Sequence, residues 1–230
     1  AATFYNLDIV NALLDFYGDT IQSQKWQIER VVGVIIDGPV KTLSSGGSLS
    51  SFSFSSKFSS KKDQVKEKIL LRILDIKSID HNYNLNSSSL LSYACEKNFV
   101  EVVKKILEND QINVNLYDPA RGDSPLNIAI RKKNDEIIKL LVECPRINLN
   151  IKNYEDRTAL MLACKKGCSD IVELLLKIPD IDYNRGDISG MTALHFACRK
   201  GDARSVELLL KMPNINVNAI AISLYYLFVK

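Results

Sequence analysis

A short apolar motif recurs four times along the chain at nearly constant spacing. It reads Thr-Ala-Leu-His-Phe-Ala-Cys at residues 192–198, Thr-Ala-Leu-Met-Leu-Ala-Cys at 158–164 and Ser-Pro-Leu-Asn-Ile-Ala-Ile at 124–130, with a weaker copy at 89–95. Successive copies begin 35, 34 and 34 residues apart. A period of this length is typical of proteins that stack one small structural unit several times. The repeat therefore restricts the fold more than any other feature of the sequence.

A second apolar stretch follows each motif, as expected for a unit built from two helices. These stretches lie at residues 102–107, 137–142, 171–176 and 205–210. In the motif and in the stretch alike, apolar residues recur at helical spacing and would share one face of a helix. Each unit then closes with Ile-Asn-Val-Asn or a close variant. One pair of helices cannot bury its own apolar face, so the sequence predicts that successive pairs pack against one another.

The residues of the repeat, rather than its length, indicate a family, because tetratricopeptide repeats have a similar period of about 34 residues. Thr-Ala-Leu-His-Phe-Ala at 192–197, followed by Gly201 and by Val-Glu-Leu-Leu-Leu at 206–210, resembles the ankyrin signature. The resemblance covers residues 83–218 as four ankyrin repeats. It implies an all-α solenoid of stacked helix pairs with β-hairpin-like loops. The chain departs from the family pattern after the second helix, where a proline turn replaces the usual glycine.

The turn between the two helices of a unit is expected to be left-handed, a conformation that glycine adopts freely and asparagine tolerates. Three units carry such residues there, namely Asn98, Gly167 and Gly201. Lys133 holds the same position in the remaining unit and predicts a strained or reshaped turn. The resemblance also implies that the ring of His195 hydrogen-bonds backbone between neighbouring units.

The flanking segments are less regular. Residues 63–82 match a second ankyrin helix and its closing turn, which predicts a half-repeat that caps the stack with its polar side outward. Residues 1–21 resemble part of another ankyrin repeat, and because the chain begins with Ala1 we expect a truncated N-terminus. Residues 22–62 are predicted to form an irregular insertion with a Ser-rich flexible loop. The apolar tail at 219–230 lacks the pattern of a fifth unit and either covers the open end of the stack or is cut short.

Composition excludes several classes of protein. The net charge is only +3, which argues against nucleic-acid binding over the whole surface. The five cysteines are an odd number in a chain of ordinary length, so we do not expect a disulfide framework. We expect instead a cytoplasmic, intracellular and reducing location. No apolar run approaches the roughly 20 residues of a membrane-spanning helix.

Signatures of catalysis are also missing from the sequence. It contains only two histidines, no Gly-rich phosphate loop and no Cys/His set with the spacing of a zinc site. We therefore do not expect an enzyme, a metal, a cofactor or a small-molecule substrate.

Basic pairs end the first helix of three units and are predicted to form a stripe on the stack. We call Arg131, Lys132, Lys165, Lys166, Arg199 and Lys200 the basic stripe. Two interpretations remain open. Cations near a helix C-terminus stabilise the helix dipole by about 0.3–1 kcal/mol each, which would explain the stripe without a ligand. Alternatively, the stripe borders the concave face and binds an acidic or phosphorylated peptide.

The resemblance implies a protein-interaction module or scaffold that binds another protein through its loop tips and inner helices. The predicted partner-binding residues are Tyr117, Arg121, Arg131, Lys132, Tyr154, Arg157, Lys165, Lys166, Arg185, Arg199 and Lys200. Two alternatives are a regulatory or targeting segment of a larger multidomain protein, and weak polyanion binding through the basic stripe. Neither the identity of the partner nor the oligomeric state follows from the sequence.

Overall fold

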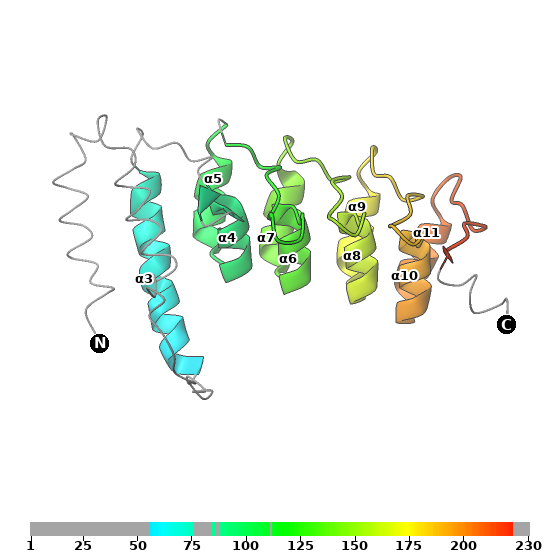
Figure 1. The fold of residues 1–230 in the computed structure, drawn as a ribbon, viewed down its shortest axis with the longest axis horizontal. Coiled ribbons are helices and arrows are strands. Elements are labelled where there is room, and N and C mark those ends of the chain that lie inside the picture. The colour runs from blue at the N-terminus through cyan, green and yellow to red at the C-terminus, as the bar shows by residue number, and fades with distance from the viewer. Residues whose placement is uncertain (1–55, 76–83, 86–87, 111, 223–230) are drawn as a thin grey trace, which may run out of the picture.

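A computed structural model of the chain describes residues 56–75, 84–85, 88–110 and 112–222. In this part, four pairs of short helices stand side by side in one row, with a longer helix at the N-terminal end (Figure 1). The elements are α3 (Ser56–Leu74), α4 (Leu90–Lys97), α5 (Val100–Leu107), α6 (Pro125–Lys132), α7 (Asp135–Glu143), α8 (Ala159–Lys166), α9 (Ser169–Leu176), α10 (Ala193–Lys200) and α11 (Ala203–Leu210). The predicted all-α solenoid of stacked helix pairs is confirmed.

Each first helix begins where the sequence supplies a capping hydroxyl. The Oγ of Ser124 accepts the amide of Asn127 at 3.3 Å, and the Oγ1 of Thr158 accepts the amide of Met161 at 3.5 Å. Such bonds satisfy amides that the first turn of a helix leaves unpaired. These helices are only eight residues long, so they are marginal in isolation and depend on packing against their neighbours.

The cap of α10 corrects one expectation. The amide of Thr192 donates to Nδ1 of His195 at 3.1 Å, and Nδ1 also lies 2.9 Å from the Thr192 hydroxyl oxygen. The predicted bond between neighbouring units is therefore wrong, because the ring serves the cap of its own helix. A residue three positions after a cap lies close enough to reach back to the cap amide, as in a capping box.

The left-handed turns between paired helices all have the same conformation. The φ angles are 65° at Asn98, 58° at Lys133, 69° at Gly167 and 74° at Gly201. The sequence predicted either a strained or a reshaped turn at Lys133. Because Lys133 has the same left-handed conformation as the other three residues, the turn is strained and not reshaped. The left-handed conformation costs an ordinary L-residue about 1–2 kcal/mol.

Lys133→Gly is expected to raise the free energy of unfolding by about 0.5–1 kcal/mol. The gain is smaller than the full strain because glycine loses more chain entropy on folding. Urea denaturation followed by circular dichroism measures it. Lys132→Gly, one residue earlier and inside α6, should lower stability by about 1 kcal/mol. A loss of stability in both variants would show that Lys133 is not strained.

The core runs without interruption along the row. The inner helices α4, α6, α8 and α10 pack in that order, and the outer helices α5, α7, α9 and α11 pack behind them. Side chains such as Leu126, Ile138 and Leu160 are fully buried between units. Each unit thus depends mainly on its neighbours, as the repeat predicts.

Helix α3 packs against α5 at the N-terminal end of this core, with Ile69, Leu70 and Ile73 buried and Arg72 exposed. It begins at Ser56 rather than near residue 63, so 56–62 are helical where a flexible loop was expected. This stretch contains neither glycine nor proline, which leaves the helix free to extend toward the N-terminus.

The loops before the inner helices have hairpin character. Strand β1 (Asn84–Leu85) pairs antiparallel with β2 (Ser88–Ser89), and Gly186 forms an isolated bridge with Thr192.

Several predicted segments lie outside the described residues. They are the partial repeat at 1–21, most of the insertion at 22–62, the closing turn after residue 75 and the tail beyond residue 222. No helix in the described ranges combines the length and the apolarity that crossing a membrane requires.

Candidate partner-binding surface

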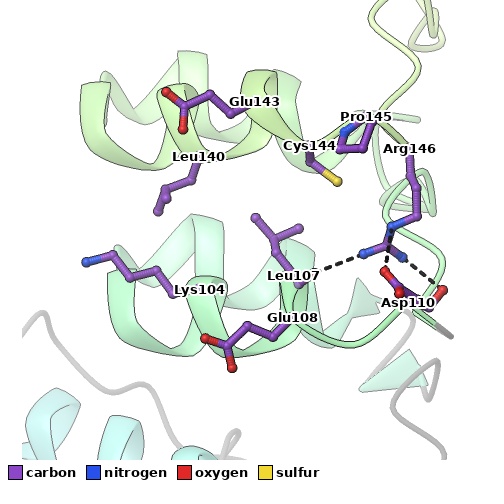
Figure 2. Close-up of a pocket in the computed structure, with 9 residues that line it drawn as sticks. All are labelled: Lys104, Leu107, Glu108, Asp110, Leu140, Glu143, Cys144, Pro145 and Arg146. Atoms are coloured by element: carbon purple, nitrogen blue, oxygen red, sulfur yellow. Dashed lines mark hydrogen bonds and ion pairs between the residues drawn. The ribbon is translucent and has the colours of Figure 1, made fainter.

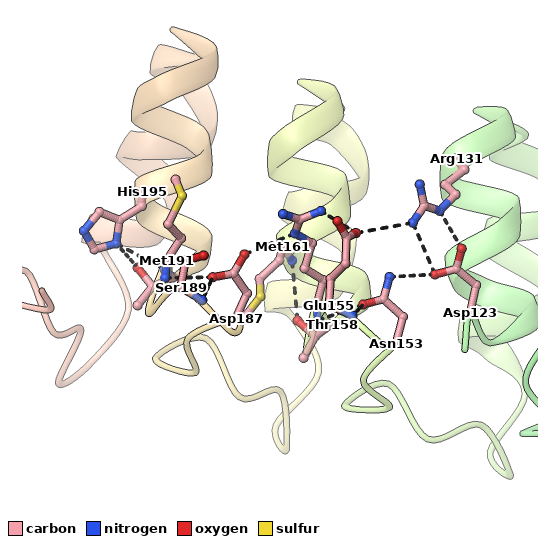
Figure 3. Close-up of polar contacts among 12 residues, drawn as sticks. Asp123, Arg131, Asn153, Glu155, Thr158, Met161, Asp187, Ser189, Met191 and His195 are labelled. Carbon is pink, nitrogen blue, oxygen red and sulfur yellow. Dashed lines mark hydrogen bonds and ion pairs between the residues drawn. The ribbon is translucent and has the colours of Figure 1, made fainter. Parts of the chain in front are cut away.

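The loops that lead into the inner helices are joined by a buried polar network, which Figure 3 shows in part. The carboxylate of Asp187 is fully buried. Its Oδ1 accepts the amides of Ser189 at 2.9 Å and Met191 at 3.0 Å, while its Oδ2 accepts Nε of Arg157 at 3.2 Å. Asp187 thereby shapes its own loop and binds the preceding unit at the same time.

The network continues into the unit before. Oδ1 of Asn153 accepts the amides of Glu155 and Arg157, each at 3.0 Å, and its Nδ2 donates to Oδ1 of Asp123 at 2.8 Å. Asp123 in turn forms an ion pair with Arg131, with 2.6 Å between Oδ2 and Nε. Polar contacts thus connect three consecutive units beneath the inner helices (Figure 3).

Two predicted partner-binding arginines are members of this network. The side chains of Arg131 and Arg157 are only 23% and 15% exposed. Arg157 also forms an ion pair with Glu155 and lies over the ring of Phe196, 5.3 Å from its centroid. Both guanidinium groups are held by internal partners. Arg157 joins its unit to the next through Asp187, whereas Arg131 pairs with Asp123 of its own unit and reaches the next unit through Glu155, at 4.0 Å.

Lys165 and Arg199 occupy the position of Arg131 in the next two units and are exposed. The pKa of Lys165 is lowered, first by burial of the ammonium group and then by the positive charge of Arg157, with smaller effects of Arg131 and Arg199, while Glu155 opposes the shift. These cations therefore lie close enough to share one electrostatic field. Within the described ranges, neither Lys165 nor Arg199 forms an ion pair.

The remaining members of the basic stripe form a second row at the turns. Nζ of Lys132 lies 3.4 Å from Glu96, Lys166 is partly buried, and the alkyl chain of Lys200 covers Gly167. All these residues lie in the last turn of an inner helix, where they also stabilise the helix dipole. The predicted stripe is therefore two rows. In the first row Arg131 is paired, while Lys165 and Arg199 are exposed and have no ion pair in the described part of the chain.

Exposed side chains also gather at the loop tips. Tyr117 and Tyr154 are 56% and 61% exposed, and Arg121 is exposed as well. Arg185 lies 3.6 Å from Asp182, so its charge is partly compensated. The sequence interpretation missed Ile188 and Ile222, which are 62% and 58% exposed. Both stand at the repeat position of Tyr154, one and two 34-residue periods after it. The 34-residue period contained the signal that would have revealed them.

A pocket of about 440 Å³ lies on the opposite side, between the C-terminal ends of α5 and α7 (Figure 2). It coincides with the proline turn that departs from the family pattern. There the guanidinium group of Arg146 donates to the carbonyl oxygens of Leu107, Asp110 and Ile112 at 2.7–3.0 Å. Its donors are thus engaged by the end of the preceding unit, and Lys104 at the pocket rim is paired with Glu136 at 3.3 Å. We interpret this pocket as part of the interface between the two units.

No three His, Cys, Asp or Glu side chains in the described part of the chain gather as a metal site requires. The five cysteines are free thiols, and burial raises the pKa of Cys164 to about 12.

Comparison with known proteins agrees with this architecture. A family model described as ankyrin repeats in three copies matches residues 60–153 and again residues 145–221, together well over half of the chain. No curated protein matches the sequence.

Proposed function

Because the chain belongs to the ankyrin-repeat family, whose members generally bind other proteins and are typically not enzymes, we propose that its concave face binds an acidic segment of a partner protein. The concave face is the side formed by the inner helices α4, α6, α8 and α10 and the adjoining loops. A phosphorylated segment presents the same chemistry with more charge.

One observation carries the proposal, namely the uncompensated charge around Lys165. Four cations share its field or its network, Arg131, Arg157, Lys165 and Arg199, against three carboxylates, Asp123, Glu155 and Asp187, which leaves 4 − 3 = +1. An incoming carboxylate would reach an ammonium group whose charge is disfavoured by its surroundings. The carboxylate would be attracted by Lys165 and by the neighbouring cations that share its field.

Charge alone would give weak binding. Exposed ion pairs contribute about 0.2–1 kcal/mol each and are screened by salt. Two such ion pairs at Lys165 and Arg199 would contribute to the orientation of a partner more than to its affinity. Apolar contacts beside them are therefore needed for tight binding.

The double variant Lys165→Glu/Arg199→Glu is expected to weaken binding of a fluorescein-labelled, glutamate-rich peptide at least about tenfold, because both attractions become repulsions. Fluorescence anisotropy at fixed low salt measures the affinity. The matched control Lys139→Glu/Lys211→Glu changes the net charge equally and should bind almost as the wild type does. Both residues are exposed, Lys139 in the outer helix α7 and Lys211 directly after the outer helix α11. Equal losses in both variants would refute a site on the concave face.

The same assay addresses the alternative of polyanion binding. Inorganic polyphosphate that competes with the peptide equally well in the wild type and in both double variants would favour non-specific attraction. The scaffold role, the regulatory or targeting alternative and the intracellular location stay predictions.

A further inference from the structure

Glu155 lies between two guanidinium groups that come from consecutive units, and Figure 3 shows its contact with Arg131. Its Oε2 forms an ion pair with Nη1 of Arg157 and lies 4.0 Å from Nη2 of Arg131. The side chain of Glu155 is 46% exposed, whereas both arginine side chains are mostly buried. A carboxylate near the surface therefore occupies the position between two cations that lie deeper.

Both guanidinium groups are held from their other side by internal carboxylates. Nε of Arg131 is paired with Asp123, and Nε of Arg157 is paired with Asp187. Terminal nitrogens of both groups are thereby left facing the Glu155 carboxylate. Because these two arginines are already fixed, they would lose little side-chain entropy when they bind an anion.

The side chain of Glu155 can leave its position while the loop keeps its shape. The amide of Glu155 donates to Oδ1 of Asn153 at 3.0 Å, and its carbonyl oxygen accepts the amide of Ile188 at 3.3 Å. The backbone is therefore held independently of the carboxylate. An ion pair with one well-exposed partner is weak, since water and salt screen it. A stronger anion can thus displace this carboxylate at little cost.

The charges around Glu155 favour a dianion in its place. Besides burial, the pKa of Lys165 responds to Arg157, Glu155 and Arg131, so its ammonium group lies close to all three. With Glu155 displaced, the four cations of this face oppose only the two buried aspartates, which leaves 4 − 2 = +2. A phosphorylated residue carries a charge of about −1.5 to −2 at pH 7 and presents three acceptor oxygens. It therefore matches the charge better than a single carboxylate does.

We propose that a phosphoryl group of the partner binds between Arg131, Arg157 and Lys165 by displacing the side chain of Glu155. The proposal rests on the proposed function and makes phosphorylated segments the preferred ligands of the concave face. Guanidinium groups suit this task because they bind phosphate oxygens through charge-assisted hydrogen bonds of defined geometry. Glu155 acts as an internal competitor, which a ligand carboxylate merely replaces and a phosphoryl group outcompetes.

Replacement of the central glutamate of the glutamate-rich peptide by phosphoserine tests the proposal by fluorescence anisotropy with the full chain. The wild type is expected to bind the phosphopeptide about fivefold more tightly than the parent peptide. Glu155→Gln removes the competing charge and keeps the shape of the side chain, so it should raise the affinity for the phosphopeptide about threefold. Glu155→Ala should give a similar gain.

The matched control is Glu207→Gln. It makes the same chemical change and the same change in net charge at an exposed residue of the outer helix α11, so it should leave the affinity unchanged. A gain of the same size in this control would show that net charge alone causes the effect, which would overturn the displacement of Glu155.

The outcomes separate this proposal from the proposed function. If Lys165→Glu/Arg199→Glu weakens binding of both peptides while both Glu155 variants bind them as the wild type does, the concave site stands and the displacement of Glu155 is overturned. Equal affinity of the wild type for the two peptides would overturn the preference for a phosphoryl group. If only the phosphopeptide binds and Glu155→Gln strengthens its binding, the phosphoryl site stands and binding of unphosphorylated acidic segments is overturned. Binding of neither peptide would overturn both.

Discussion

Asp187→Ala lowers the free energy of unfolding by about 3–5 kcal/mol, the largest loss we expect from a single substitution in these loops. The variant leaves the guanidinium group of Arg157, which is only 15% exposed, without its buried carboxylate. It also removes the acceptor of the Ser189 and Met191 amides, which lie in a partly buried loop. Because Asp187 joins two units, the loss weakens their interface as well as the loop itself. Urea denaturation followed by circular dichroism measures the change.

The control for this variant is Asp182→Ala. Asp182 is a loop aspartate that also pairs with an arginine, Arg185, but the two side chains are 40% and 46% exposed. Ion pairs of that kind contribute about 0–1 kcal/mol, so this variant should remain close to the wild type. Asp187→Asn keeps an acceptor for the two amides and removes the charge. Its free energy of unfolding should therefore lie between those of Asp187→Ala and Asp182→Ala. Equal stability of Asp187→Ala and Asp182→Ala would show that the buried network does not join the units.

Asn127→Leu is expected to raise the free energy of unfolding by about 1–3 kcal/mol. The Asn127 side chain is fully buried, and among the described residues neither its Oδ1 nor its Nδ2 has a hydrogen-bond partner. A buried polar group without a partner costs about 1–3 kcal/mol, and leucine of nearly the same shape removes that cost. Met161 stands at the same repeat position in the next unit and is buried at 1% exposure, so an apolar side chain fits there.

The same substitution at Asn153 serves as the comparison, because it should have the opposite sign. Asn153 is also buried, but its amide donates to Asp123 and accepts two backbone amides. Asn153→Leu should therefore lower stability by about 1–3 kcal/mol. If both variants lose stability, the amide of Asn127 is paired in solution and our explanation is wrong.

The features that were predictable from sequence are those set by periodicity and local chemistry. The spacing of apolar residues placed every inner and outer helix, and Ser or Thr before each inner helix marked its start. Lys133 was expected to conflict with the left-handed turn, and its φ of 58° shows that the backbone accepts the strain. These features depend on a few neighbouring residues, so they could be predicted from a single sequence.

The side-chain pairings between neighbouring units were harder to predict from the sequence. Arg157 and Asp187 are 30 residues apart, and their contact depends on how the two loops are stacked. Sequence interpretation assigned Arg131 and Arg157 to a partner without the internal carboxylates, Asp123 and Asp187, that pair with them in the structure. The exposed loop tips show the reverse case, because the repeat period already aligned Ile188 with Tyr154 and only the exposure of these side chains was unknown.

Photo-crosslinking of the unmodified chain tests the central claim most directly. A glutamate-rich peptide carrying a benzophenone group would be bound to the protein and irradiated, and the crosslinked residues would be mapped by mass spectrometry. We expect crosslinks on the inner helices α6, α8 and α10 and at the loop tips around Ile188, all competed by unlabelled peptide. Crosslinks that fall on the outer helices α5, α7, α9 and α11 would contradict a partner-binding site on the concave face.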